Sequence, residues 1–168
     1  MKKIILDTNV YGEIAKEKTP SLALERIETQ KEFVFYGIRE VIRKEVRNTP
    51  KDVKIAGRSL RILLLGLYDS IVKGHELNLT EEMCSIAERY YDAYREFGGS
   101  KPKDKIINDF LIVACASLKK MNILVSSDNY TMLTENALRA YNIINKTKDI
   151  ETPEFIDYLE FKRRLFSL

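Results

Sequence analysis

The chain begins with a stretch that passes from apolar to polar residues, Ile4-Ile5-Leu6-Asp7-Thr8-Asn9. The apolar, partly β-branched residues at positions 4–6 are typical of a short buried strand. Asp7 ends this strand, and a helical pattern begins near Val10. A strand that passes directly into a helix is the first unit expected of an α/β domain with a parallel sheet.

The same alternation of strands and helices continues through the rest of the 168 residues. We expect further strands at residues 33–36, 123–127 and 142–145, and helices that begin near residues 10, 20, 38, 53, 80, 104, 131 and 152. The strands are too far apart for hairpins, so the pattern predicts a three-layer α/β/α sandwich around a parallel sheet. It also predicts one domain over residues 1–168, with an added helical pair as an insert at about 53–98 and a helical extension at about 152–166.

The composition is that of an ordinary globular protein, with 45% hydrophobic and 32% charged residues. No stretch approaches the roughly 18 apolar residues of a membrane span. The first strand is too short, and too soon interrupted by Asp7, to be a signal peptide. We therefore expect a cytoplasmic protein without membrane association. The net charge of +3 is compatible with a nucleic-acid partner but does not identify one.

Cysteine and histidine offer little chemistry in this chain. Cys84 and Cys115 fall inside helical patterns without metal-ligand spacing, so we expect both to be reduced, buried packing residues. The single histidine, His75, follows a glycine in a loop and is expected at the surface. One histidine excludes a zinc site made of histidines alone.

Acidic residues, in contrast, stand at particular structural points. Asp7 and Asp128 each follow a predicted strand, and ligands of parallel sheets bind outside the carboxyl ends of the strands. Aspartate is also common there simply because it suits turns and helix caps. Asp109 is harder to explain as a turn residue, because it lies in a helix whose residues 106–116 are apolar almost all round. A carboxylate on that helix needs a hydrogen-bonding partner, a lysine or a metal ion to offset its desolvation.

The helix after the second strand offers two glutamates, Glu40 and Glu45. At helical spacing Glu45 continues the apolar stripe, whereas Glu40 falls on the opposite, solvent-facing side. We therefore predict Glu45 as the fourth inward acid. Carboxylates that converge repel one another unless a proton or a cation intervenes. An all-oxygen set without histidine or cysteine suits Mg²⁺ or Mn²⁺.

Four segments of the chain together resemble the PIN domain ribonucleases, in order and spacing. These segments are residues 5–9 (Ile-Leu-Asp-Thr-Asn), 41–46 (Val-Ile-Arg-Lys-Glu-Val), 108–116 (Asn-Asp-Phe-Leu-Ile-Val-Ala-Cys-Ala) and 124–128 (Leu-Val-Ser-Ser-Asp). The family often has Ser, Thr or Pro where Gly37 and Ile38 stand here, and commonly Thr at the position of Ser126.

The resemblance implies a parallel sheet of about five strands and metal-assisted hydrolysis of RNA with Mg²⁺ or Mn²⁺. It implies the following roles: Asp7, Glu45, Asp109 and Asp128 as catalytic, metal-binding acids, Thr8 as the hydroxyl that orients Asp7, and Asn9 and Ser126 as residues that line the site. RNA would be the substrate, and a homodimer or an antitoxin protein would be further partners. Basic residues that could approach the phosphate backbone, or be plain solvated surface, are Lys16, Lys18, Arg39, Lys101, Lys103 and Lys105.

Two other functions stay open at this point. A phosphatase of the haloacid dehalogenase type also begins with a strand and an aspartate, but it needs a second acid where this chain has Asn9. A non-catalytic RNA-binding or partner-binding module could keep the same fold, although the aromatic platforms of single-strand binders are missing. Within the nuclease class, a toxin and an RNA-processing enzyme both fit the sequence, and because toxins that the chain resembles are usually shorter, its length slightly favours a stand-alone or processing role.

Overall fold

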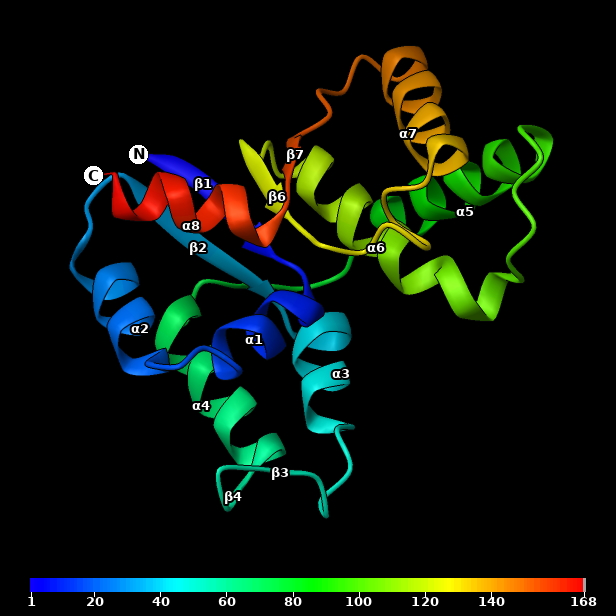
Figure 1. Cartoon of the computed structure of the whole chain (residues 1–168). Helices are drawn as coiled ribbons and strands as arrows, with labels where there is room; N and C mark the ends of the chain where they lie inside the picture. The colour runs from blue at the N-terminus through cyan, green and yellow to red at the C-terminus, as the bar shows by residue number, and fades with distance from the viewer. Residues whose placement is uncertain (168) are drawn as a thin grey trace.

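Five parallel strands form the central sheet of the computed structural model, which describes residues 1–167 (Figure 1). Their order across the sheet is β5-β2-β1-β6-β7, and every neighbouring pair is parallel. The strands are β1 (Lys2–Leu6), β2 (Phe33–Ile38), β5 (Glu76–Leu77), β6 (Ile123–Val125) and β7 (Glu154–Ile156). Ile4, Ile5 and Leu6 are fully buried, as expected for the middle strand of a sheet covered on both faces.

Helices cover the sheet in two groups that pack among themselves (Figure 1). One group contains α1 (Thr8–Ala15), α2 (Pro20–Thr29), α3 (Lys44–Arg47), α4 (Leu60–Val72) and α8 (Tyr158–Phe166). The other contains α5 (Glu81–Glu96), α6 (Lys103–Leu118) and α7 (Glu135–Thr147). This arrangement confirms the predicted three-layer α/β/α fold with a five-stranded parallel sheet.

The predicted buried helix is α6, which packs against α5 and the π-helical turn at Arg39–Arg43. Phe110 is fully buried and meets the rings of Tyr90, Tyr94 and Tyr141 edge-on, with centroid separations of 5.5–6.2 Å. Edge-to-face contacts of this kind stabilise a core beyond the area that they bury. The aromatic cluster therefore joins α6 to α5 and α7, and it fixes the helix that carries Asp109.

Two predictions near the C-terminal end of the chain were wrong. Residues 142–145 do not form a strand but belong to α7. The helix places the side chain of Asn145 on its inner face, where it is buried. There its side chain accepts a hydrogen bond from the Tyr90 hydroxyl and donates to Ser117 and Thr152. The helix expected from Thr152 begins instead at Tyr158, after Asp157 as its cap, because residues 154–156 pair with β6 as the last strand.

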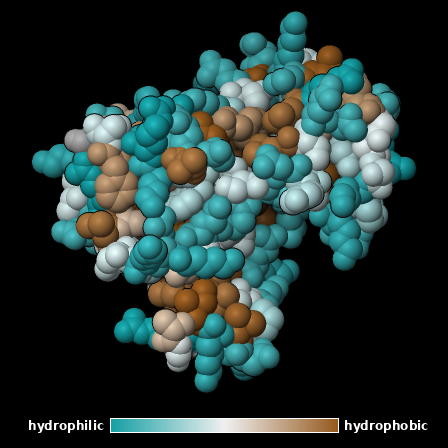
Figure 2. Space-filling view, in the orientation of Figure 1, coloured by the Kyte–Doolittle hydropathy of each residue, from teal (hydrophilic) through white to brown (hydrophobic). Residues whose placement is uncertain are grey.

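The insert at 53–98 is less helical than predicted. Its Cys84 is also exposed and not buried, because it lies on the outer face of the helix at residues 81–96, whereas Cys115 is buried as predicted. It contains α4 and α5, but also a hairpin of β3 (Lys54–Ile55) and β4 (Arg58–Ser59) and the edge strand β5. The hairpin and α4 lie at the lower end of the molecule in Figure 1, where Figure 2 shows apolar side chains gathered at the surface. No helix among residues 1–167 combines the length and the apolar character that a membrane crossing requires.

Gly37 in β2 lies against the ring of Tyr68 on α4. A Cβ atom at position 37 would lie 2.1 Å from the Tyr68 hydroxyl oxygen, which is far inside van der Waals contact. Tyr68 is 1% exposed, so its ring is held in place by the side chains packed around it. The chain therefore requires glycine here in order to bring α4 against the end of β2.

Candidate active site

Asp7 lies directly after the central strand and caps the N-terminus of α1. Its Oδ1 accepts a hydrogen bond from the Thr8 backbone N–H at 2.7 Å. Its Oδ2 accepts from the Ser126 hydroxyl at 2.7 Å and from the Asn9 side-chain amide at 2.8 Å. The side chain is buried, with the residue 4% exposed. Three donors from two elements therefore hold this carboxylate in one orientation.

Burial raises the pKa of Asp7 to about 6, although the hydrogen bonds from Ser126 and Thr8 act in the opposite direction. The negative charges of Glu45 and Asp128 raise the pKa of Asp7 further. A carboxylate that is both desolvated and surrounded by other acids favours the arrival of a proton or a cation.

Glu45 reaches the site from α3, which follows a π-helical turn, η1 (Arg39–Arg43). Its Oε2 accepts a hydrogen bond from the Thr8 hydroxyl, and its Oε1 accepts from the Asn108 side-chain amide at 2.8 Å. Glu45 is half-buried, whereas Glu40 on η1 is exposed. The π-helical turn widens the helix locally, and such turns occur often at functional sites.

The role that the sequence predicts for Thr8 needs correction. Its hydroxyl does not orient Asp7, because it donates to Glu45 instead. Only the backbone N–H of Thr8 contacts Asp7. The reason is geometric: Thr8 is the first residue of α1, so its N–H faces the capping carboxylate while its side chain projects toward α3.

Asp109 and Asp128 meet at one threonine hydroxyl. Thr131 Oγ1 lies 2.5 Å from Asp109 Oδ2 and is also hydrogen-bonded to Asp128 Oδ2. A threonine hydroxyl carries one proton and can donate fully to only one carboxylate. The other contact is satisfied when that carboxyl is itself protonated and donates to the threonine oxygen. Burial, followed by the charges of Asp7, Asp128 and Glu45, raises the pKa of Asp109 to about 7, although the hydrogen bond from Thr131 acts in the opposite direction.

The four acids thus face one region at the carboxyl edge of β1 and β6, and each is held by a neutral polar group. Asn9 and Ser126 both donate hydrogen bonds to Asp7. Within residues 1–167, however, no three Asp, Glu, His or Cys side chains are already close enough to hold a metal ion together. Thr8 links Asp7 to Glu45, and Thr131 links Asp109 to Asp128. The four acids do not surround a common position for a metal ion.

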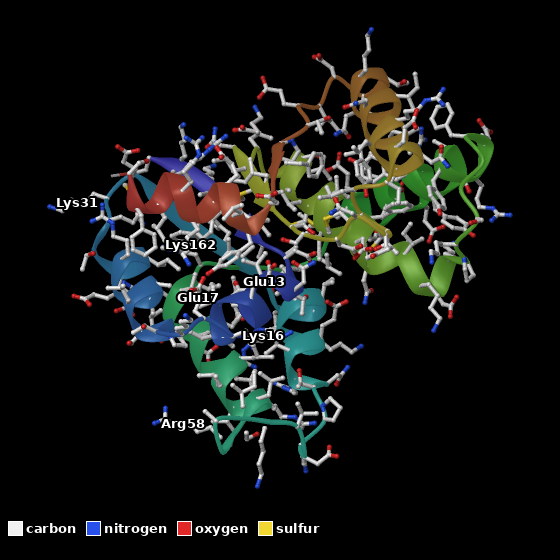
Figure 3. All side chains as sticks on the ribbon, in the orientation of Figure 1. Glu13, Lys16, Glu17, Lys31, Arg58 and Lys162 are labelled. Atoms are coloured by element: carbon white, nitrogen blue, oxygen red, sulfur yellow. The ribbon has the colours of Figure 1, made fainter. Side chains whose placement is uncertain are left out.

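Three contributing residues were missed from the sequence. Asn108 and Thr131 contact the acids directly, and Glu13 accepts a hydrogen bond from the Ser127 hydroxyl at 2.9 Å, beside the same edge (Figure 3). Asn108 directly precedes Asp109, and that adjacency was a usable signal. Nothing in the sequence indicated Thr131, because its position depends on the turn that follows β6.

The predicted basic residues do not form one surface of unpaired charge. Arg39 is ion-paired with Glu76, and Lys103 with Glu88. The remaining four, all exposed, are Lys16, Lys18, Lys101 and Lys105. Lys16 and Glu17 directly follow α1, which carries Glu13, so positive and negative side chains lie among one another there (Figure 3).

The raised pKa of Asp109 predicts a pH-dependent stability. Because the pKa rises from 3.8 to about 7 on folding, the folded protein binds more protons between these values. Stability from this group is fully present below about pH 4 and is lost as the pH rises through 7. Without divalent ions, we expect the free energy of unfolding to fall by roughly 3 kcal/mol between pH 5 and 8.

Urea unfolding at both pH values measures this difference. The Asp109→Asn variant lacks this group but keeps Asp7, whose pKa is also raised, so its stability should fall with pH by clearly less than that of wild type. An equal loss in wild type and variant would contradict the assignment of the effect to Asp109.

The comparison with solved structures found a match that agrees with this architecture. No protein-family model matches the chain, and the comparison with curated proteins found no match. The parallel sheet and its helical layers are those of a PIN-like fold. A similar solved structure is a chain of VapBC2 from Rickettsia felis bound to a DNA fragment from their promoter. The match has a TM-score of 0.55 and 13% sequence identity, and it covers 92% of this chain and 98% of the other. At this identity the likeness concerns the fold.

Proposed function

We propose that this protein is a metal-dependent ribonuclease that hydrolyses phosphodiester bonds of RNA at the carboxyl edge of its sheet. The observation that carries the proposal is the convergence of Asp7, Glu45, Asp109 and Asp128 on one region, with the pKa of Asp7 and Asp109 raised by burial and by the other acids. A site that accumulates uncompensated negative charge in this way is suited to bind a cation.

The donor set fits Mg²⁺ or Mn²⁺ by its chemistry, because it consists of carboxylate, hydroxyl and amide oxygens. The absence of a closed cage among residues 1–167 is compatible with Mg²⁺, which keeps several waters and uses one or two carboxylates together with substrate phosphates. We assign Asp7, Asp109, Asp128 and Glu45 as the residues that would hold the ion. When bound, it would supply an activated water and stabilise the charge that develops on the phosphodiester.

The residues around the acids have positioning roles in this proposal. Ser126 and Asn9 fix the Asp7 carboxylate, and Thr8 and Asn108 fix that of Glu45 through one oxygen each. Asp109, whose pKa is raised to about 7, can give or take a proton near neutral pH. Partners of this kind keep acidic side chains in their productive orientation.

The biological role that we favour is that of a nuclease paired with a second protein. The structural neighbour comes from a VapBC2 complex bound to DNA, and this supports an antitoxin-type partner for the present chain. An RNA-processing nuclease without such a partner is the alternative. A small open reading frame next to the gene would favour the first.

Two glutamates on neighbouring turns test the site. With single-stranded RNA and Mn²⁺ or Mg²⁺, Glu45→Gln should lower the cleavage rate by about a hundredfold or more, because it removes a charge held in the site. Glu40→Gln changes an exposed residue of the same segment and should cleave at the wild-type rate. EDTA should stop cleavage by wild type and by Glu40→Gln, because it removes the divalent ion. Loss of activity in Glu40→Gln but not in Glu45→Gln would show that we assigned the wrong face of this helix to the site.

A further inference from the structure

An exposed tyrosine lies beside the acids at the carboxyl edge of the sheet. Tyr130 is 84% exposed, whereas the other eight of the nine tyrosines are buried or half-buried. Its ring therefore presents most of its surface to solvent. Burying a large aromatic side chain is favourable, so a ring that is left outside next to the proposed active site is available to a ligand.

A chain of hydrogen bonds ties the backbone at Tyr130 to the acids. The backbone N–H groups of Tyr130 and Thr131 both donate to Asp128 Oδ1, at 2.9 Å each. The Asp128 N–H donates to Ser126 Oγ at 3.1 Å, and this hydroxyl donates to Asp7 Oδ2 at 2.7 Å. Two residues of chain span at most roughly 7 Å, so Tyr130 is close to Asp128 in space as well as in sequence.

The turn after β6 does not itself require an aromatic residue at position 130. The contact with Asp128 uses only the backbone N–H, which every residue except proline can donate. Turn positions are usually taken by Gly, Pro, Asn, Asp or Ser, and the neighbouring Asn129 follows this preference. The turn therefore accounts for the backbone of Tyr130 and leaves its ring without a structural role.

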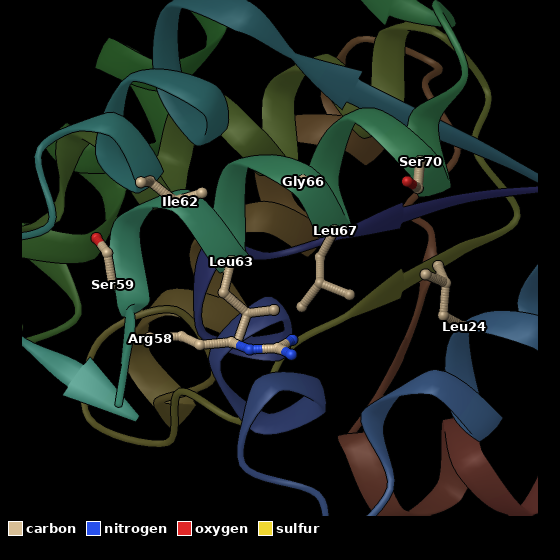
Figure 4. A pocket seen from close by; sticks show the side chains of 8 residues that line it. All are labelled: Leu24, Arg58, Ser59, Ile62, Leu63, Gly66, Leu67 and Ser70. Carbon is tan, nitrogen blue, oxygen red and sulfur yellow. The ribbon is translucent and has the colours of Figure 1, made fainter. Parts of the chain in front are cut away.

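A larger apolar surface of the molecule lies away from the acids. It is a groove of about 520 Å³ between α2 and α4, and Leu24, Ile62, Leu63 and Leu67 are among the residues that line it (Figure 4). None of the four acids or their hydrogen-bond partners belongs to this lining. The groove offers aliphatic side chains and no aromatic ring, so it lacks the flat surface on which a base stacks.

An RNA strand whose phosphate lies at the acids carries bases on the nucleotides next to that phosphate. In single-stranded RNA these bases can be turned outward and stacked on aromatic side chains, tyrosine among them. Every base has a π face, so a single exposed ring is sufficient to hold one of them. One ring in a turn is less than the several platforms that the sequence lacks, and it accounts for one base and not for a run of bases.

From these observations we propose that Tyr130 is a substrate-binding residue that stacks on one unpaired base of the RNA, next to the phosphate at the acids. The proposal rests on the proposed ribonuclease function, and it adds a contact that holds the strand. Stacking uses the π face that all bases share, so this contact gives affinity without choosing a sequence. It favours single-stranded over duplex RNA, because the bases of a duplex are already stacked on their neighbours.

Stacking can be measured separately from cleavage. The chain contains no tryptophan, so Tyr130→Trp places a single indole reporter in the turn. Combined with Asp7→Asn, which should abolish most cleavage, this variant should lose tryptophan fluorescence when a short single-stranded RNA binds with Mg²⁺, because the base stacks on the indole. A strand of the same length without bases should leave the fluorescence unchanged. Equal quenching by both strands, or none by either, would overturn the proposal.

Variants of the active protein then connect the ring to cleavage. Tyr130→Ala should raise the KM for single-stranded RNA about tenfold and leave kcat within about twofold, because the contact holds the strand equally before and during the reaction. Tyr130→Phe keeps the ring and should behave as wild type. Ile62→Ala is the matched control, because it truncates a 72% exposed apolar side chain of the groove on α4 and should change neither constant.

The outcomes separate this proposal from the proposed function. Thermal melting should show Tyr130→Ala to be as stable as wild type, since the ring is exposed. An unchanged KM in Tyr130→Ala would overturn the stacking role even if wild type cleaves RNA. Quenching by RNA but not by the strand without bases, in a protein whose wild type does not cleave RNA, would support the stacking contact and overturn the proposed function.

Discussion

Asp7→Asn should lower the rate of metal-dependent RNA cleavage by about a thousandfold. Asp7 is the most deeply buried of the four acids, and its carboxylate lies at the end of the central strand with both oxygens already oriented by neighbours. Asparagine keeps the size of the side chain and is as good a helix cap, so the backbone at the start of α1 should be unchanged. What disappears is the negative charge that the proposed ion would need.

The measurement uses purified wild type and variant on labelled single-stranded RNA with Mn²⁺ or Mg²⁺, analysed on denaturing gels. Asp52→Asn removes an exposed carboxylate of a loop and serves as the matched control, with wild-type activity expected. Unfolding in urea at pH 8 should show Asp7→Asn to be at least as stable as wild type, since a desolvated charge has been removed. Equal cleavage by wild type and Asp7→Asn would identify a contaminating nuclease.

Phe110→Ala should destabilise the fold by about 3–5 kcal/mol, which is the usual cost of removing a buried ring and leaving a cavity. Phe110 is fully buried and contacts three tyrosine rings from α5 and α7, so the surrounding side chains cannot collapse easily into the space. Because Phe110 directly follows Asp109, a loss of order here should also loosen the acid beside it.

Urea denaturation measures this change in the free energy of unfolding. Leu159→Ala on α8 is the control, because that leucine is 74% exposed and its truncation should cost less than about 0.5 kcal/mol. A loss below about 1 kcal/mol for Phe110→Ala would mean that α6 is not fixed by the aromatic cluster.

Local sequence patterns were sufficient to predict the elements whose own residues favour one kind of secondary structure. The apolar run before Asp7 and the continuous apolar surface of α6 predicted a buried strand and a buried helix, and both are present. Residues 154–156 could not be assigned in this way, because Thr152 and Pro153 resemble a helix start. Pairing with β6 decides the structure there, and that pairing depends on the whole sheet.

The candidate site also contains residues that could be predicted from the sequence and contacts that could not. The acids could be chosen from their places after strands and on helix faces, and the structure brings all four to one edge. Their hydrogen-bond partners could not be chosen, since the contacts of Asn108 and Thr131 depend on side-chain directions and on the turn after β6. The prediction that Thr8 orients Asp7 by its hydroxyl was wrong for this reason.

The contact between Gly37 and Tyr68 has a consequence for how this sequence can vary. The tyrosine hydroxyl occupies the space that any side chain at position 37 would need. A relative with serine or threonine at that position must therefore carry a smaller residue in place of Tyr68, so the two positions should change together across an alignment. In the laboratory the same coupling would appear as rescue, with Gly37→Ala harmful alone and tolerated when combined with Tyr68→Leu.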